Sequence, residues 1–379
     1  NMPARDAIMT ARMKAAGCIV IGKTTTPELG LGSHTFSTLW GRTHNAWDPA
    51  VSAGGSSGGA AVSLAQRMLP IADGSDFMGS LRNPAGWNHV YGMRPSQGRV
   101  PQAGNADVWI DLLSTEGPMG RSIEDVGRLL ATQAGFAPAA PMSLQSRFAW
   151  GGAAARPEQL RGLRIGWLGD VGGHLATEPG VLDACREALH HLAAPGAVVE
   201  EIPLGFDAAQ LWECWLTWRR AIAGPRVGAL MHLPGARKKV KAEAQWEYEG
   251  SLGLSYADFR QASQVRSSYY QHMHAMFDRW DVLALPSAQC WPFPGAERWP
   301  RQLAGRAMDT YHRWMECTIY ATLAGLPALV VPAGFHSNGT WPMGLQIIGR
   351  YGDDAGVLRA GAAYEALRGD FIGRRPRTP

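Results

Sequence analysis

The chain has 379 residues, of which 46% are hydrophobic and 18% are charged, so it can bury the core of one large domain or of two smaller ones. Its apolar residues occur in short runs, and none approaches the roughly 20 residues that a membrane-spanning helix needs. The 36 basic and 32 acidic residues are spread along the whole sequence, which favours neither a polyanion-binding face nor a nucleic-acid partner. We therefore expect a globular protein that binds neither membranes nor nucleic acid.

The cysteines and histidines predict no disulfide framework and no metal site. The five cysteines are an odd number and show no paired ligand spacing, and the pair His190 and His191 has no metal-ligand spacing either. We expect no cofactor and a reducing, cytoplasmic location, since the first residues lack the order of a secretory signal. The cysteines are Cys18, Cys185, Cys214, Cys290 and Cys317.

The first third of the chain predicts helices and short strands around a long loop. Apolar residues at helical spacing indicate a helix over residues 7–15 with Gly17 as its C-cap, and Cys18 to Ile21 reads as a short buried strand. A loop over about 24–53 leads to an alanine-rich helix over 60–68 and to a short strand near Ile71 and Ala72.

A capping pattern and a change of composition mark the next segment. Ser122 to Asp125 resembles a capping box and predicts a helix that ends near Ala134. The Gly, Pro and Ala residues of 135–157 are typical of a linker, where a subdomain boundary could fall.

The rest of the chain alternates β-like runs with helical segments, which predicts an α/β fold whose sheet is covered on both faces. Between these runs, residues 206–279 form a Trp-rich helical stretch that could cap the sheet or only pack on it. The expected strands are Arg164–Trp167, Val198–Ile202, Val282–Leu285, Ala328–Val331 and Gly344–Ile348.

Two serines occupy glycine-rich segments that suit acyl-transfer chemistry. Ser56 and Ser57 lie within Gly54–Gly59, directly before a helix whose N-terminus offers free N–H donors. A linker or a phosphate loop is the alternative, but the segment continues into an apolar helix and lacks the Lys-Ser/Thr pair of a phosphate loop. Ser80 follows 24 residues after Ser56, in a turn whose backbone N–H groups could form an oxyanion hole.

Together these motifs resemble the amidase signature family, whose hallmark is a Gly-Gly-Ser-Ser-Gly-Gly segment followed by an Asp-x-Gly-Gly-Ser turn. The likeness extends over nearly the whole chain, as one amidase domain over 1–379. Further matching segments are Gly22–Thr24 with Pro27–Glu28, Asn45–Pro49, Gly92–Ser96 with Gly98–Pro101, and Gly325–Gly349.

The resemblance implies one large mixed β-sheet flanked by helices, and a Ser-cisSer-Lys mechanism. Ser80 would attack the carbonyl carbon, and Ser56, on a cis peptide bond, would pass the proton to a neutral lysine, which burial can make basic enough near pH 7. The N–H groups of Phe77, Met78, Gly79 and Ser80 would hold the oxyanion.

The chain departs from the family pattern at the lysine. Lys14 and Lys23 precede Ser56, and both match positions that are not catalytic in the family, so we expect the lysine base upstream of residue 1. Met78 stands where the family has glycine, which predicts a narrower pocket, and Ser75 replaces a threonine without expected effect.

Other residues near the motifs have supporting or structural interpretations. Asp76 and Arg82 are expected to hold the Ser80 turn by charge-assisted hydrogen bonds, and Ser57 either orients its loop or caps a helix. Cys290 and Cys317 resemble pocket-lining positions, but buried cysteine more often only packs, and neither is predicted as a nucleophile.

The predicted function is hydrolysis of non-peptide amides through a serine acyl-enzyme, with a small-molecule amide as substrate. Esters are further possible substrates, because acyl transfer to serine needs no nitrogen leaving group. The alternatives are an amidotransferase subunit that supplies ammonia and a non-catalytic relative that binds amides. A homodimer is a possible assembly.

Overall fold

The computed structural model describes residues 4–104, 106–152 and 156–377. Its main strands are β3 (Ile71–Asp76), β4 (Tyr91–Arg94), β5 (Thr115–Gly120), β6 (Arg164–Trp167), β7 (Val198–Glu201), β8 (Val282–Pro286), β11 (Ala328–Phe335) and β12 (Pro342–Gly349). Within the described residues these eight strands form one sheet in the order β3-β5-β4-β11-β12-β8-β6-β7. Neighbours from β3 to β8 are antiparallel, and β6 pairs in parallel with β8 and β7. The expected α/β fold with a large mixed sheet is confirmed.

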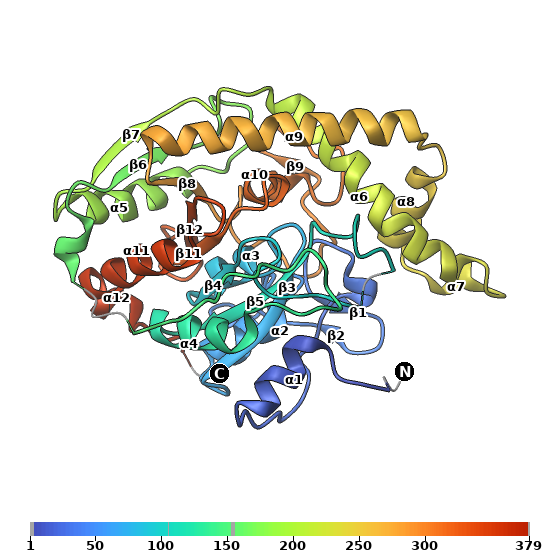
Figure 1. Ribbon diagram of the computed structural model, residues 1–379, viewed down its shortest axis with the longest axis horizontal. Coiled ribbons are helices and arrows are strands. Elements are labelled where there is room, and N and C mark those ends of the chain that lie inside the picture. Colours follow the sequence, from blue (N-terminus) through green and yellow to red (C-terminus); the bar gives the residue numbers. More distant parts are fainter. Residues whose placement is uncertain (1–3, 105, 153–155, 378–379) are drawn as a thin grey trace.

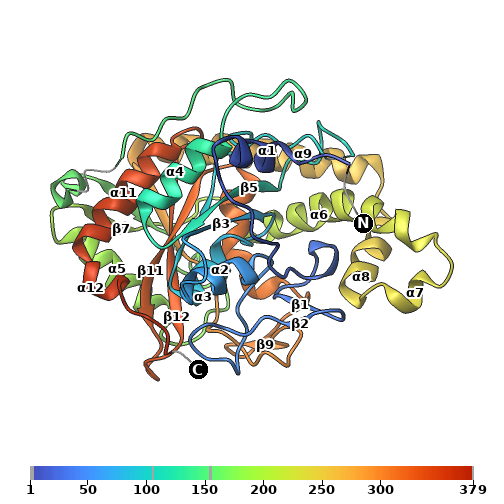
Figure 2. The same ribbon diagram turned by 90° about the horizontal axis from the view of Figure 1, so that it is seen from below.

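Helices cover both faces of this sheet. On one face, Val330 of β11 packs with α2 and α3, and on the other face Ile347 of β12 meets α5 and α11. In Figure 2, α2 and α3 lie on the opposite side of β11 and β12 from α5 and α11. The α-helices are α1 (Ile8–Ala15), α2 (Gly58–Ala65), α3 (Arg82–Asn88), α4 (Ile123–Gln133), α5 (Val181–Ala193), α6 (Ala208–Met231), α7 (Ala236–Lys239), α8 (Ala242–Ser251), α9 (Tyr256–Arg279), α10 (Ile319–Leu323), α11 (Asp354–Leu367) and α12 (Gly369–Ile372).

Shorter elements connect the layers. The strand pairs β1 (Phe36–Ser37) with β2 (Gly41–Arg42) and β9 (Gln302–Leu303) with β10 (Arg306–Ala307) form small hairpins outside the main sheet. The 3₁₀-helices are η1 (Glu28–Gly30), η2 (Pro157–Leu160) and η3 (Arg313–Thr318).

The central strands read as continuous apolar runs because helices cover both of their faces. Every residue of β8 and β12 is buried. In β11 every residue is buried except the last, Phe335, which is partly exposed. All five strands expected after residue 160 are present, with ends that differ from the expectation by at most a few residues.

The Trp-rich segment is helical, as predicted. Asp207 caps α6 by accepting from the backbone of Ala209 and Gln210, and Ser255 with Asp258 forms a capping box at the start of α9. Figure 1 shows α9 along the upper edge of the molecule and α6 with α8 below its right-hand part. A capping role for 206–279 stays a prediction, as does the single-domain organisation.

The N-terminal strand prediction is wrong. Cys18 to Ile21 forms no strand, and the side chains of Ile19 and Ile21 are 88% and 74% exposed. An apolar run becomes a buried strand only where another segment pairs with it or covers it, and no described residue does so here.

Two nearby expectations agree better with the structure. Ser122 caps the N-terminus of helix α4, because its side chain accepts from the Asp125 N–H. Helix α2 ends at Ala65, before the expected end at Met68, because Arg67 adopts a left-handed conformation with φ 59°.

Among the described residues, no helix combines the length and the apolar character that crossing a bilayer requires.

Candidate active site

The two serine segments lie against each other. The N–H of Ser57 donates to the carbonyl of Ser80 over 3.2 Å, and Ser56 and Ser80 both line a cavity of about 430 Å³. Ser56 is 8% exposed, whereas Ser80 is partly exposed. The structure therefore brings the predicted nucleophile and the predicted proton relay to one cavity.

The peptide bond between Gly55 and Ser56 is cis, as the resemblance implied. The side chain of Asn83 holds this segment by two hydrogen bonds. Its Oδ1 accepts from the N–H of Gly55 over 2.9 Å, and its Nδ2 donates to the carbonyl of Gly55 over 2.8 Å. Because Asn83 lies on α3, just after Ser80, it fixes the relay segment relative to the nucleophile.

Thr35 fixes the same segment from the other side. Its buried hydroxyl lies 2.9 Å from the carbonyl oxygen of Gly54 and 3.2 Å from that of Ser56, and it accepts from the Gly58 N–H over 3.1 Å. The Thr35 N–H also donates to Gly54. One side chain thus contacts the backbone before Ser56, at Ser56 and after it.

Close packing explains two of the motif glycines. A Cβ atom at Gly55 would lie 2.8 Å from the Cα of His34. Gly79 has φ +79°, where a side chain is strained, and a Cβ atom there would lie 2.6 Å from the side chain of Thr318. Larger residues at these positions would displace the backbone next to Ser56 and Ser80.

The turn before Ser80 presents backbone N–H groups. The Gly79 N–H donates to Asp76 over 2.9 Å, so this member of the predicted oxyanion set is already engaged inside the turn. The N–H groups of Phe77, Met78 and Ser80 make no hydrogen bond within the described chain. Three of the four predicted donors thus have no hydrogen-bond partner among the described residues.

The carboxylate of Asp76 organises this turn from the buried side. It accepts from the Gly79 and Leu81 N–H groups and forms ion pairs with Arg82 at 2.8 Å and Arg94 at 3.3 Å. All three charged side chains are fully buried. Burial alone would raise the pKa of Asp76, but the charges and hydrogen bonds of Arg82 and Arg94 hold it well below its usual range.

Arg82 connects this cluster to the sheet and to α10. Its Nη1 donates to the carbonyl of Thr318 over 2.9 Å and to Gln346 over 2.7 Å, and its Nη2 donates to the Thr322 hydroxyl over 2.9 Å. Every donor direction of the guanidinium is therefore used within the protein. Arg82 therefore supports the turn together with Asp76, as predicted, and has no free donor for a substrate.

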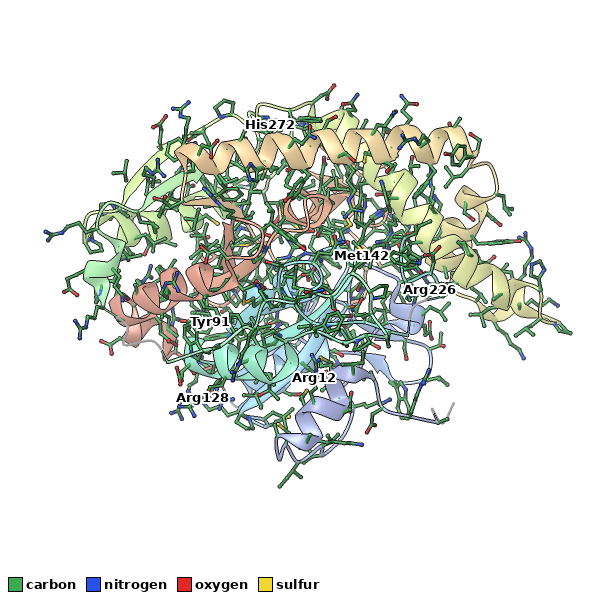
Figure 3. The ribbon with its side chains drawn as sticks, in the orientation of Figure 1. Arg12, Tyr91, Arg128, Met142, Arg226 and His272 are labelled. Atoms are coloured by element: carbon green, nitrogen blue, oxygen red, sulfur yellow. The ribbon has the colours of Figure 1, made fainter. Side chains whose placement is uncertain are left out.

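The cavity wall is mostly apolar. Phe77 contributes one side of it, and its ring lies 5.2 Å from that of Trp215 on α6. Two charged side chains, Asp111 and Arg226, line it as well; Arg226 lies on α6 (Figure 3). The apolar lining residues are Leu29, Leu31, Phe77, Ile222, Ala223, Val227 and Leu230.

The expectation that Met78 narrows the pocket is wrong. Its side chain is 1% exposed, packs in the main hydrophobic core and is absent from the cavity lining. The backbone of the turn directs Phe77 toward the cavity and Met78 away from it, so the residue that shapes the pocket is Phe77.

Comparisons with known proteins agree with this geometry. The family model described as Amidase matches residues 1–358. The chain belongs to the amidase signature family. An acylamidase of Rhodococcus erythropolis is 33% identical over 97% of this chain and 76% of its own length. A glutamyl-tRNA(Gln) amidotransferase subunit of Chloroflexus aurantiacus is 33% identical over 99% of this chain and 79% of its own length.

Solved structures of amidase signature enzymes share the fold. A bacterial aryl acylamidase superposes with a TM-score of 0.88 at 27% identity, over 99% of this chain and 79% of its own. The 6-aminohexanoate cyclic dimer hydrolase in complex with substrate gives 0.83 at 27% identity, over 98% and 80% of the two chains.

No lysine of the described residues lines the serine cavity. Lys14 pairs with Asp6 at 2.8 Å, and Lys23 is exposed. Lys241, which the sequence did not single out, donates to the carbonyl of Leu31 over 2.9 Å and lies 4.0 Å from the centre of the Phe36 ring. Burial lowers the pKa of Lys241, but both contacts favour its charged form, which cannot act as a base.

The remaining candidates have the roles of packing and orientation. Burial raises the pKa of Cys290 and of Cys317 well above that of a free thiol, so neither supplies a thiolate near neutral pH. The hydroxyl of Ser57 caps no helix and instead donates to the carbonyl of Ser75 over 3.4 Å. This contact supports the loop-orienting interpretation of Ser57.

Replacing Thr35 with valine is expected to lower kcat by about 10 to 100-fold, with a smaller change in KM. Valine has nearly the shape of threonine, but it leaves the Gly58 N–H and the Ser56 carbonyl without the Thr35 hydroxyl as partner. The segment is then expected to shift, and a displaced Ser56 hydroxyl slows the chemical step. Steady-state amide hydrolysis checks this, with Thr35→Ser expected to restore most of kcat. Thr132→Val, at a partly exposed site on α4, is the matched control; equal effects of both valine variants would contradict the positioning role.

Proposed function

We propose that the protein hydrolyses carbon-nitrogen bonds of non-peptide amides through an acyl-enzyme on Ser80. The Ser80 hydroxyl oxygen attacks the carbonyl carbon while its proton passes through Ser56 to a neutral lysine. The N–H groups of Phe77, Met78 and Ser80 stabilise the negative charge on the former carbonyl oxygen. The protonated base then returns the proton to the leaving amine, and water cleaves the ester by the same path in reverse.

One observation carries this proposal. Ser56 and Ser80 open into the same cavity, beside backbone N–H groups that form no hydrogen bond with any described residue. A hydroxyl nucleophile, a second hydroxyl and oxyanion donors in one cavity are the parts that acyl transfer to serine requires. The base is the part that the described residues do not provide, and we propose that it is a lysine upstream of residue 1.

The apolar wall of the cavity favours an acyl or aryl group without charge. Side chains of α6, with Phe77 and two leucines, surround the space next to Ser80, and burial of apolar surface contributes roughly 25 cal/mol per Å². The names of two related proteins, an acylamidase and an aryl acylamidase, support such a substrate. We propose acyl and aryl amides ahead of glutamine.

An amide panel tests this proposal. The protein as encoded is assayed with an aryl acylamide, an aliphatic acylamide, the matching ester, a short peptide and glutamine. Faster hydrolysis of the acylamides than of the peptide and of glutamine supports the proposal. Turnover of the peptide alone, or of none of these compounds, would overturn it.

An amidotransferase subunit is the second candidate, because a glutamyl-tRNA(Gln) amidotransferase subunit is 33% identical to the chain. Purification from the native source distinguishes the two. Stoichiometric partner chains and glutamine-dependent ammonia release favour the subunit, whereas an active enzyme without partner chains favours the amidase. A homodimer, ester hydrolysis and a cytoplasmic location stay predictions.

A further inference from the structure

The two helices that start at the serine segments end at one small cavity. Helix α2 begins directly after Ser57 and is followed by Arg67, and α3 begins two residues after Ser80 and is followed by His89. Arg67 and His89 both line a cavity of about 230 Å³. Arg121, just before α4, and Arg374, in the C-terminal segment, are among the residues that complete its wall.

This cavity carries an excess of positive charge. Arg67, Arg121 and Arg374 line it, and none of the three forms an ion pair with an acidic side chain of the described residues. Burial, followed by the neighbouring charges of Arg375 and Arg121, lowers the pKa of Arg67. Arg67 and Arg121 are thus close enough to repel each other, and Arg67 and Arg374 are exposed to solvent.

Capping of the helix ends accounts for only part of this charge. Arg121 donates to the carbonyls of Leu64 and Leu69 at the end of α2. Two helix C-termini together amount to about one negative charge. The acidic residue of the lining, Glu365, adds at most one more, and burial raises its pKa to about 7. The three arginines therefore carry more positive charge than the helix ends and Glu365 offset.

His89 adds an independent polar feature to the wall. Its side chain is 6% exposed, its Nε2 lies 2.9 Å from the carbonyl oxygen of Phe371, and its Nδ1 has no hydrogen-bond partner among the described residues. Because Nε2 donates to that carbonyl and burial lowers the pKa of His89 to about 4, the ring is neutral near pH 7 and its Nδ1 is an acceptor. A protonated oxygen of hydrogen phosphate, or an ordered water, can donate to it and recover the cost of leaving it unpaired.

We propose that this cavity binds a phosphate-sized oxyanion held by Arg67, Arg121 and Arg374. Planar guanidinium groups match the oxygen pairs of phosphate, and the volume is below the roughly 300 Å³ at which pockets for drug-sized ligands begin. The bound anion would join the C-terminal ends of α2 and α3 to the C-terminal segment, on the far side of these helices from the serines.

Isothermal titration in a buffer free of phosphate and sulfate tests this, with sodium chloride matching the ionic strength. We expect saturable binding of one inorganic phosphate per chain. The Kd should rise at least about tenfold in Arg374→Gln and in Arg67→Asn; asparagine is chosen at position 67 because it tolerates the positive φ of Arg67. Arg128→Ala is the control, because Arg128 lies on α4 outside the cavity and pairs with Glu124 (Figure 3); it should bind as wild type.

A second arm distinguishes the sources of the anion. Tighter binding of glycerol phosphate than of inorganic phosphate indicates a phosphate monoester as ligand, and the reverse order indicates the free ion. No saturable binding of either by the wild type, or equal binding by Arg374→Gln and the wild type, would overturn the proposal. Because the readout is binding, the result does not depend on amidase activity.

Discussion

Replacing Ser80 with alanine is expected to lower kcat for amide hydrolysis by at least about 10⁴-fold while leaving the fold intact. The proposed mechanism has no other group that can form the acyl-enzyme, and removing a serine nucleophile from a comparable site costs up to about 10⁶-fold. Ser80 is partly exposed at the cavity, so the loss of one hydroxyl should leave stability nearly unchanged. Steady-state kinetics and thermal unfolding of the purified variant check both parts.

The matched control for this variant is Ser75→Ala. Ser75 lines the same cavity five residues earlier in the chain but has no step in the proposed mechanism, and its backbone contact with Ser57 does not need its hydroxyl. We expect Ser75→Ala to keep activity within about threefold of wild type. Equal losses in both variants would mean that the cavity, and not the Ser80 hydroxyl, determines the rate.

Replacing Asp76 with asparagine is expected to destabilise the protein by about 3–5 kcal/mol, because it leaves the buried charges of Arg82 and Arg94 without their counter-charge. Urea unfolding at pH 7 measures the change. The control is Asp183→Asn, which breaks an exposed pair with Arg186 and should cost less than about 1 kcal/mol. A small effect of Asp76→Asn would show that the Ser80 turn does not depend on this cluster.

The pH dependence of this difference follows from the direction of the Asp76 pKa. Folding lowers the pKa of Asp76. Its carboxylate therefore contributes its full stabilisation at pH values above the pKa of the unfolded state, about 3.9. This contribution is lost as the pH falls through the lower pKa of the folded state. The stability gap between wild type and Asp76→Asn should stay constant from pH 7 to pH 5 and narrow below about pH 4. A gap that widens in acid would contradict this sign.

The sheet was predictable because its strands have a simple signature. Ala328–Val331 and Gly344–Ile348 read as apolar runs, and both lie in strands covered by helices on the two faces. The same signature failed at Cys18 to Ile21, where the run is exposed. A local apolar pattern states a preference for burial, but tertiary neighbours decide whether burial occurs.

The serines of the site were predictable from their glycine-rich surroundings, and their supports were only partly so. Asp76 and Arg82 flank Ser80 in sequence, whereas Thr35 precedes Ser56 by 21 residues in a loop without periodicity. Asn83 lies within the Ser80 motif, but its two bonds to Gly55 depend on the fold. The direction of the Met78 side chain depends on the turn backbone, which residue type alone does not determine.

The most direct test of the central claim is the intact mass of the protein as encoded, before and after reaction with a serine-directed fluorophosphonate. We expect one adduct per chain in the wild type and in Ser75→Ala, and none in Ser80→Ala. Absence of an adduct in the wild type, or an adduct that persists in Ser80→Ala, would contradict the assignment of Ser80 as an activated nucleophile.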